Sequence, residues 1–126
     1  MSSSEAAASR EFGKNRRLRR HAEFQKVFDS GQRIRGRFLT LLVASGQASL
    51  PRLGIVASRK LGDSVRRNRA KRLIRELFRQ FDSPESLAGV DVVVIPRVEL
   101  FGATYTSLEE DFRTVFVRGL ARLKRT

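Results

Sequence analysis

The amino-acid sequence predicts an α+β protein, a two-layer α/β sandwich in which helices pack on a β-sheet. Some segments are dense runs of aliphatic residues with the length and composition of strands. Others place apolar residues three or four positions apart, as amphipathic helices do. Along the chain these segments follow the order α-β-β(-β)-α-β-α without an internal repeat, which favours two packed layers.

The N-terminal part combines a tail with a first helix. Residues 1–15 are mostly small or polar and lack periodicity, so we expect a disordered tail before a single domain at 16–126. A short helix is predicted over 21–30, because Phe24, Val27 and Phe28 fall on one face. Gly31 follows as a C-terminal stop.

The strands come next. Residues 37–44 contain the apolar run FLTLLVA, and residues 52–58 (RLGIVAS) form a second strand signal after a turn. An additional short strand at 33–35 remains an option. A third buried strand is predicted at 90–95 (VDVVVI), where Pro96 ends it.

Two longer helices complete the prediction. The first spans 63–81, with Asp63 or Ser64 as its N-cap and a continuous apolar face. The last helix begins at Thr106 or Ser107, and Ser107 with Glu110 has the spacing of a capping box.

Composition indicates the kind of partner. The chain has 126 residues, 26 Lys and Arg against 13 Asp and Glu, a net charge of +13, and no cysteine. The length, the missing cysteines and the lack of a long apolar run exclude a large multidomain enzyme, a disulfide scaffold and a membrane protein. Arg makes up 21 of the 26 cations, and its planar fork grips phosphate at two points. The surplus therefore favours a nucleic-acid partner over charge kept only for solubility.

The helix at 63–81 carries the strongest functional signal. Its apolar face is centred near Ala70 and Leu77. The side roughly opposite carries Asn68 and a row of cations, Arg72, Arg75 and Arg79. Like charges at this spacing destabilise a helix by about 0.2–0.5 kcal/mol per pair, and only Glu76 offers relief along the row. An external polyanion explains the row better than an ordinary solvated face, which would mix signs. The connection before the helix, Ser58 to Asp63, adds a weaker signal for phosphate at a helix N-terminus.

This helix also carries a resemblance. The stretch SRKLGDSVRRNRAKRLIRELF, from Ser58 to Phe78, resembles the signature of the bacterial ribonuclease P protein family. The segments HAEFQKVF at 21–28 and GVDVVVIPR at 89–97 are similar to the family's opening and to its last strand. The resemblance covers about residues 16–123 and implies a left-handed crossover between parallel strands through the Arg-rich helix.

The resemblance implies a function as the protein component of ribonuclease P. Such a protein binds the catalytic RNA and the 5′ leader of precursor tRNA, and assists Mg²⁺-dependent removal of that leader. The RNA carries the catalysis and holds most of the Mg²⁺. The implied partners are ribonuclease P RNA and precursor tRNA, with no membrane and no obligate protein partner, and we expect a cytoplasmic location.

The family's functional residues map onto this chain as two groups, with no catalytic residue and no metal ligand assigned. The residues implied to contact the catalytic RNA are Arg66, Arg67, Asn68, Arg69, Lys71, Arg72 and Arg75. The residues implied to form the leader cleft are Phe24, Phe28, Phe38, Leu42, Ser58, Arg59 and Lys60. The family often has an aromatic residue where this chain has Leu42. Spacing alone would equally place Phe24 and Phe28 in the core; with the resemblance we expect at least one ring to be partly open to solvent.

Two rival interpretations remain. A structural RNA-binding protein, such as a ribosomal protein, would share the size, charge and predicted fold. A protein nuclease acting alone is disfavoured, because His21 is the only histidine and no carboxylate spacing stands out.

Overall fold

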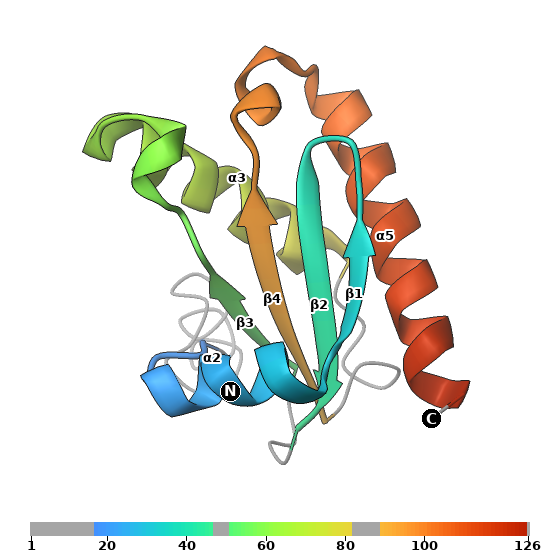
Figure 1. The fold of residues 1–126 in the computed structure, drawn as a ribbon. Coiled ribbons are helices and arrows are strands. Elements are labelled where there is room, and N and C mark those ends of the chain that lie inside the picture. The colour runs from blue at the N-terminus through green and yellow to red at the C-terminus, as the bar shows by residue number, and fades with distance from the viewer. Residues whose placement is uncertain (1–16, 47–50, 82–88, 126) are drawn as a thin grey trace, which may run out of the picture.

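A computed structural model describes residues 17–46, 51–81 and 89–125, and its elements follow the predicted order (Figure 1). The helices are α2 (His21–Ser30), α3 (Ser64–Phe81) and α5 (Tyr105–Arg125). The strands are β1 (Gln32–Arg35), β2 (Leu39–Ser45), β3 (Arg52–Ile55) and β4 (Val90–Pro96). Two 3-10 turns, η2 (Arg59–Leu61) and η3 (Val98–Gly102), follow β3 and β4. The α+β prediction is confirmed, and the optional strand near 33–35 is β1.

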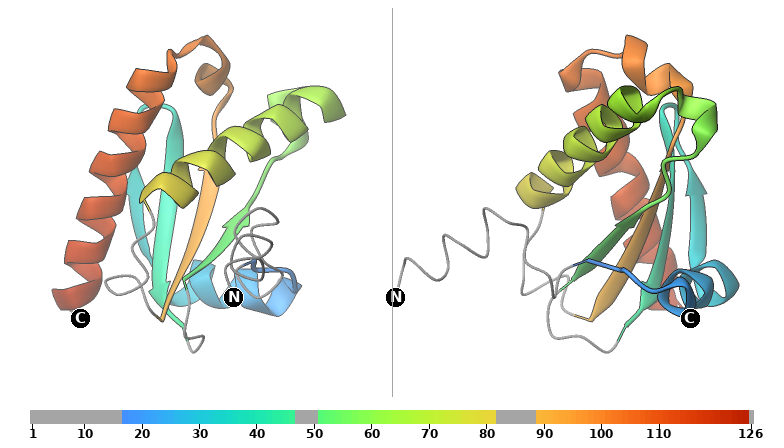
Figure 2. Two further views of the ribbon diagram at one scale, coloured as in Figure 1. Left: turned by 180° about the vertical axis from the view of Figure 1, so that it is seen from behind. Right: turned by 90° about the vertical axis from the view of Figure 1, so that its left-hand side faces the viewer.

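The four strands form one sheet in the order β1-β2-β4-β3. β2 pairs antiparallel with β1 and β4, whereas β3 and β4 are parallel and are connected through α3. Seen from the side on which α3 lies, β3 and β4 both run upward and β4 lies to the left of β3 (Figure 2, left). The crossover is therefore left-handed, a hand that only about 2% of such connections adopt.

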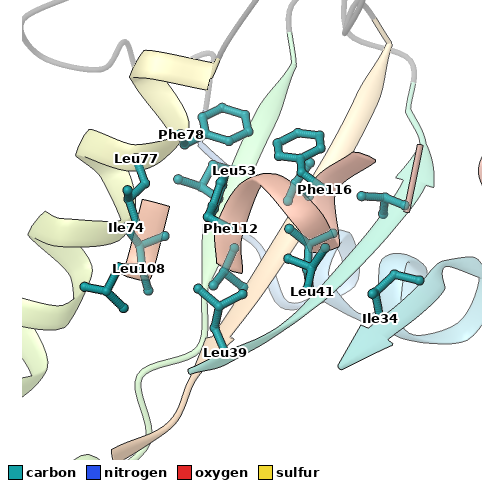
Figure 3. Close-up of a cluster of buried hydrophobic side chains, with 14 of the residues drawn as sticks. Ile34, Leu39, Leu41, Leu53, Ile74, Leu77, Phe78, Leu108, Phe112 and Phe116 are labelled. Atoms are coloured by element: carbon teal, nitrogen blue, oxygen red, sulfur yellow. The ribbon is translucent and has the colours of Figure 1, made fainter. Parts of the chain in front are cut away.

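The main core fills the space between the sheet and helices α3 and α5 (Figure 3). Phe78 of α3 stacks on Phe116 of α5 with ring centroids 5.9 Å apart, and Phe112 meets Phe116 edge-on at 5.5 Å. A Cβ atom on Gly119 would lie 3.1 Å from Val43, so this glycine lets α5 approach β2 closely. These contacts fix α3 with one face against the core and the other toward solvent.

Helix α2 packs on the opposite face of the sheet, near one end (Figure 1). Its buried residue Val27 joins Leu42, Ala44 and Val93 in a second, smaller cluster, to which Leu18 also belongs. The sandwich therefore has a partial third layer, and the part of this sheet face beyond α2 carries no helix among the described residues. This arrangement creates the edge at which α2 meets β3.

Element boundaries differ slightly from the predicted ones. β3 ends at Ile55 rather than at Ser58, because the chain leaves the sheet toward η2 after Val56 donates a last backbone hydrogen bond to Val94 (3.0 Å). Helix α5 begins at Tyr105, where the Thr104 hydroxyl accepts from the Ser107 N–H (3.1 Å). The capping box predicted at Ser107 was therefore placed one turn too late.

The sequence also predicted a disordered N-terminal tail and no membrane-spanning segment. The predicted tail at 1–15 lies outside the described residues. Within the described helices, none has both the length and the apolar character that crossing a membrane requires.

Candidate nucleic-acid interface

Helix α3 presents its outer face as a row of exposed polar and cationic side chains. The helix begins where the Asp63 carboxylate accepts the Arg66 N–H at 3.0 Å, which confirms Asp63 as the cap. Ala70, Ile74, Leu77 and Phe78 are buried against the core. Because that face is fixed, the opposite side shows Asn68, Arg69, Arg72 and Arg79 to solvent.

Arg66 takes part in a local contact at the start of the same helix. Its guanidinium lies over the ring of Phe101 in η3, 4.2 Å from the ring centroid. A cation at this distance from an aromatic face is electrostatically attracted. Arg66 therefore ties α3 to η3 while its side chain remains exposed.

The other flank of α3 faces the segment before α2, residues 17–20, rather than open solvent. We call this segment the N-terminal arm. Arg67, Lys71 and Arg75 are half-buried, although the helical period placed Arg75 on the outer face. The cause is the arm: Arg17 pairs with Leu53 of β3 in a parallel bridge, and the Leu18 N–H donates to the Leu53 carbonyl at 3.0 Å. Arg17, Lys71 and Arg75 together line a cavity of about 120 Å³ at this edge of the sheet.

Burial and like charge affect this cluster. Partial burial, and then repulsion from Arg17, hold the pKa of Arg75 below its usual range. Such a gathering of cations is stabilised by anions, since a bound phosphate offsets the repulsion. The sequence contained no local signal for the arm's pairing, because the partner strand lies more than thirty residues away.

A second feature is a hollow where α2 meets β3. The volume of this hollow is about 440 Å³. Its lining residues come from α2, from β3 and from the chain directly beside them: Arg19, His21, Phe24, Gln25, Phe28, Ile55 and Val56. Phe28 is 39% exposed, which confirms that one ring is open to solvent. Phe24 is half-buried, and its ring lies so close to Gly54 that a Cβ atom there would be 2.6 Å away.

The other predicted cleft residues lie elsewhere. Leu42 is 2% exposed and packs beneath α2 beside Val27, so it is not accessible and does not line the hollow. Phe38 packs against the main core, and the Arg37 guanidinium lies 5.0 Å from its ring centroid. Ser58, Arg59 and Lys60 are exposed beyond the end of β3 and do not line the hollow. Alternation along a strand predicts faces, but it does not show where a helix covers them.

An ionic cluster holds α2 in place beside this hollow. Arg52 of β3 donates two hydrogen bonds to the Asp91 carboxylate, both 3.0 Å, and a third to Glu23 at 2.8 Å. Glu23 also accepts the backbone N–H groups of Arg19 and Arg20. The bond from Arg20, then that from Arg19, and the contact with Arg52 lower the pKa of Glu23 from 4.5 to about 2. The three residues join α2, β3 and β4, and the sequence analysis missed them.

The described residues also bear on metal binding and on catalysis by side chains. Within the described ranges, no group of three or more His, Asp or Glu side chains is arranged to hold a metal ion. His21 is exposed at the rim of the α2–β3 hollow, whose described lining residues include no carboxylate. The site's chemistry is therefore that of arginine, aromatic and backbone groups.

The left-handed crossover and the arginine-bearing helix place the chain in the fold class of known ribonuclease P proteins. The ribonuclease P protein of Thermotoga maritima matches with a TM-score of 0.66 and 32% identity, over 87% of this chain and 96% of that one. That of Staphylococcus aureus matches with a TM-score of 0.71 and 28% identity, over 80% and 92%.

Sequence comparisons define the family. The family model described as ribonuclease P matches residues 12–119. The ribonuclease P protein component of Azotobacter vinelandii is 41% identical over 116 residues, which cover 90% of this chain and 87% of that protein. The chain belongs to the ribonuclease P protein family, whose members are protein components of a tRNA-processing ribonucleoprotein endoribonuclease.

Proposed function

We propose that this protein binds the catalytic RNA of ribonuclease P and the 5′ leader of precursor tRNA, and so assists removal of the leader. The observation that carries the proposal is the outer face of α3, where Asn68, Arg69 and Arg72 are exposed side by side. Arginine forks suit phosphate oxygens, and a neighbouring amide suits phosphate, sugar or base edges. This face is the contact with the catalytic RNA.

The leader lies in the α2–β3 hollow. A single strand exposes its bases, and proteins hold such strands by stacking on aromatic rings beside cationic groups. Phe28 supplies an accessible ring, and Arg19 supplies a cation on the rim. The cavity at Arg17, Lys71 and Arg75 shares Phe24 and Ile55 with this hollow, so it extends the basic path toward α3.

The hydrolysis itself belongs to the RNA in this proposal. Mg²⁺ held mainly by RNA phosphates would supply a metal-activated water for this hydrolysis. The protein's residues bind and orient the leader and neutralise phosphate charge, and no side chain transfers a proton. The reaction takes place in the cytoplasm, where precursor tRNA is made.

The deciding experiment is co-purification followed by reconstitution. The tagged full chain is isolated, the bound RNA is sequenced, and that RNA is assayed for precursor-tRNA cleavage with and without the protein. We expect one abundant structured RNA whose Mg²⁺-dependent cleavage the protein stimulates. Recovery of ribosomal RNA without cleavage would assign the chain to the structural RNA-binding class instead.

A variant of the only histidine tests where the chemistry lies. His21 borders the leader hollow, so His21→Ala can alter substrate affinity. The cleavage rate of the assembled enzyme at saturating precursor tRNA should stay within about twofold, since proton transfer by a side chain typically contributes 10²-fold or more. Cleavage of precursor tRNA by the purified protein without RNA would refute the proposed division of roles.

A further inference from the structure

A second basic surface lies at the far edge of the sheet from β3, between β1 and α5, which run side by side (Figure 1). Five exposed arginines come from these elements and the β1–β2 turn: Arg33, Arg35, Arg37, Arg118 and Arg122. Three of them, Arg35, Arg37 and Arg118, line an open hollow of about 560 Å³. We call this surface the β1–α5 groove.

The groove is held in a defined shape by a buried carboxylate. Asp111 of α5, 9% exposed, accepts the backbone N–H groups of Arg37 and Phe38 at 3.0 and 2.9 Å. A Cβ atom on Gly36 would lie 2.8 Å from the same carboxylate, so only glycine allows the turn to approach this closely. The turn is therefore fixed on α5, and Arg35 and Arg37 are presented on either side of it.

Beyond the hollow, a further contact joins α5 to β1. The Arg122 guanidinium donates to the Arg33 carbonyl at 3.3 Å, across from α5 to the free edge of the sheet. An open strand edge invites pairing with other chains, and a covering arginine opposes it. The edge is thus suited to a polyanion rather than to an added strand.

The charge of the groove is unbalanced. Both oxygens of Asp111 are occupied by backbone donors, so this carboxylate does not pair with the arginines beside it. Glu110 is the other acid that lines the hollow. In the part of the chain that the structure describes, Arg35, Arg37 and Arg118 make no ion pair. Three guanidinium groups face two carboxylates, so the lining keeps a net positive charge that favours an anionic partner.

The lining indicates which kind of nucleic acid fits. None of the described residues that line the hollow is aromatic, so it offers no platform for unpaired bases. Its side-chain hydrogen-bond donors are the arginine guanidinium groups and the hydroxyls of Ser107 and Thr114, and such donors bind phosphate and sugar oxygens. We propose that the β1–α5 groove is a second RNA-binding surface, and that it binds the phosphate backbone of double-helical RNA.

The groove and the outer face of α3 are separate surfaces. The residues that line the hollow come from β1, the β1–β2 turn and α5, and none of them belongs to α3. One protein therefore offers RNA two surfaces, and so it bridges two segments of RNA.

The inference deepens the proposed function, since it rests on RNA being the partner. Its first test measures binding of the full chain to a short RNA duplex at several salt concentrations. Arg35→Gln with Arg118→Gln should reduce affinity severalfold and lower the salt slope by up to about two. The matched control, Lys26→Gln with Lys124→Gln, removes equal charge from exposed positions outside the groove and should change both quantities less.

A single variant with the opposite sign sharpens the test. Glu110→Gln removes the exposed acid of the groove, so it should strengthen duplex binding about two- to threefold at low salt. Melting temperatures of all variants verify that they are folded. An unchanged or weaker affinity of the Glu110→Gln variant would overturn the proposal.

Bridging is measured by energy transfer between donor- and acceptor-labelled duplexes mixed with protein. Wild-type protein should produce transfer, whereas the Arg35/Arg118 variant should bind single duplexes without producing it. Equal losses in the lysine control, or a loss confined to single-stranded RNA, would overturn the assignment. Failure here leaves stimulation of precursor-tRNA cleavage intact, whereas failure of the proposed function would abolish that stimulation without affecting duplex bridging.

Discussion

Phe24 and Phe28 share one face of α2 but differ in exposure, because Phe28 is exposed whereas Phe24 is half-buried. Phe28 is 39% exposed at the α2–β3 hollow, whereas the Phe24 ring packs on Gly54. The two residues stand four positions apart, and their sequence spacing treats them alike. This difference in exposure results from how α2 sits on β3.

Substitution of the two rings tests this division. Phe28→Ala should weaken precursor-tRNA binding by about 1–3 kcal/mol through lost base stacking, with little change in melting temperature. Phe24→Ala should lower the stability instead, by up to about 3 kcal/mol. The affinities for precursor and mature tRNA and the melting temperatures are measured on both variants. Equal losses for the two tRNAs with Phe28→Ala would show that this ring does not contact the leader.

Glu23 makes the stability of the protein sensitive to acid. Its pKa is about 2 in the folded state against an ordinary 4.5, so the carboxylate stabilises the fold above pH 4.5. This contribution disappears as the pH falls from 4.5 toward 2. Glu23→Gln should therefore lower stability at neutral pH by on the order of 2 kcal/mol, and the difference from wild type should shrink across that acid range.

Thermal melts of both proteins between neutral pH and pH 2 provide the measurement. Glu99→Gln, at an exposed carboxylate of η3, is the matched control and should show a small offset at every pH. A stability difference for Glu23→Gln that stays constant through the acid range would contradict the coupling to Arg52 and the backbone of α2.

At the scale of elements, α2 depends on a glycine in its partner strand. A Cβ atom at position 54 would overlap the Phe24 ring at 2.6 Å, so Gly54→Ala should displace α2 and destabilise the protein. Because the overlap is with that ring, the effect should be smaller in a Phe24→Ala background. Denaturant unfolding of the two single variants and the double variant gives the coupling energy, expected at about 0.5–3 kcal/mol. Additive effects would show that Gly54 acts through another contact.

Helix α3 keeps its outer arginines at some cost in like-charge repulsion, which the proposed RNA contact would offset. Arg69→Ala with Arg72→Ala should lower the salt slope of binding to the catalytic RNA by about two at most, without loss of thermal stability. Arg69→Lys with Arg72→Lys keeps the charge, so the slope should persist while affinity falls where a fork grips two oxygens. Binding assays over a salt series distinguish the two pairs. Normal RNA binding by the folded alanine pair would remove the outer face of α3 from the interface.

For the whole molecule, the fold separates three basic regions with different neighbours. These regions lie at different places around the sheet: the outer face of α3, the cavity at Arg17 beside β3, and the β1–α5 groove at the other edge. The buried carboxylates of Asp91 and Asp111 hold the framework between these regions.

Much of this architecture could be predicted from the sequence alone. The order of helices and strands, the bounds of α2, the length of α3 and its Asp63 cap follow from periodicity and capping, which are local properties. The cationic row on α3 was likewise predicted, because an apolar stripe on a helix defines the opposite face. The hand of the crossover and the two RNA-contacting groups were implied by resemblance to the family rather than by any pattern in the residues.

Only the tertiary structure decided which residues meet. The arm's pairing with β3 half-buries Arg75, the Arg52 bridge joins Glu23 to Asp91, and Phe38 faces the main core, away from the hollow that contains Phe24 and Phe28. The β1–α5 groove joins residues more than seventy positions apart, through Asp111 and the turn at Gly36. Contacts of this kind depend on the path of the chain through space. They leave no periodic signal, because neither partner's local conformation depends on the other.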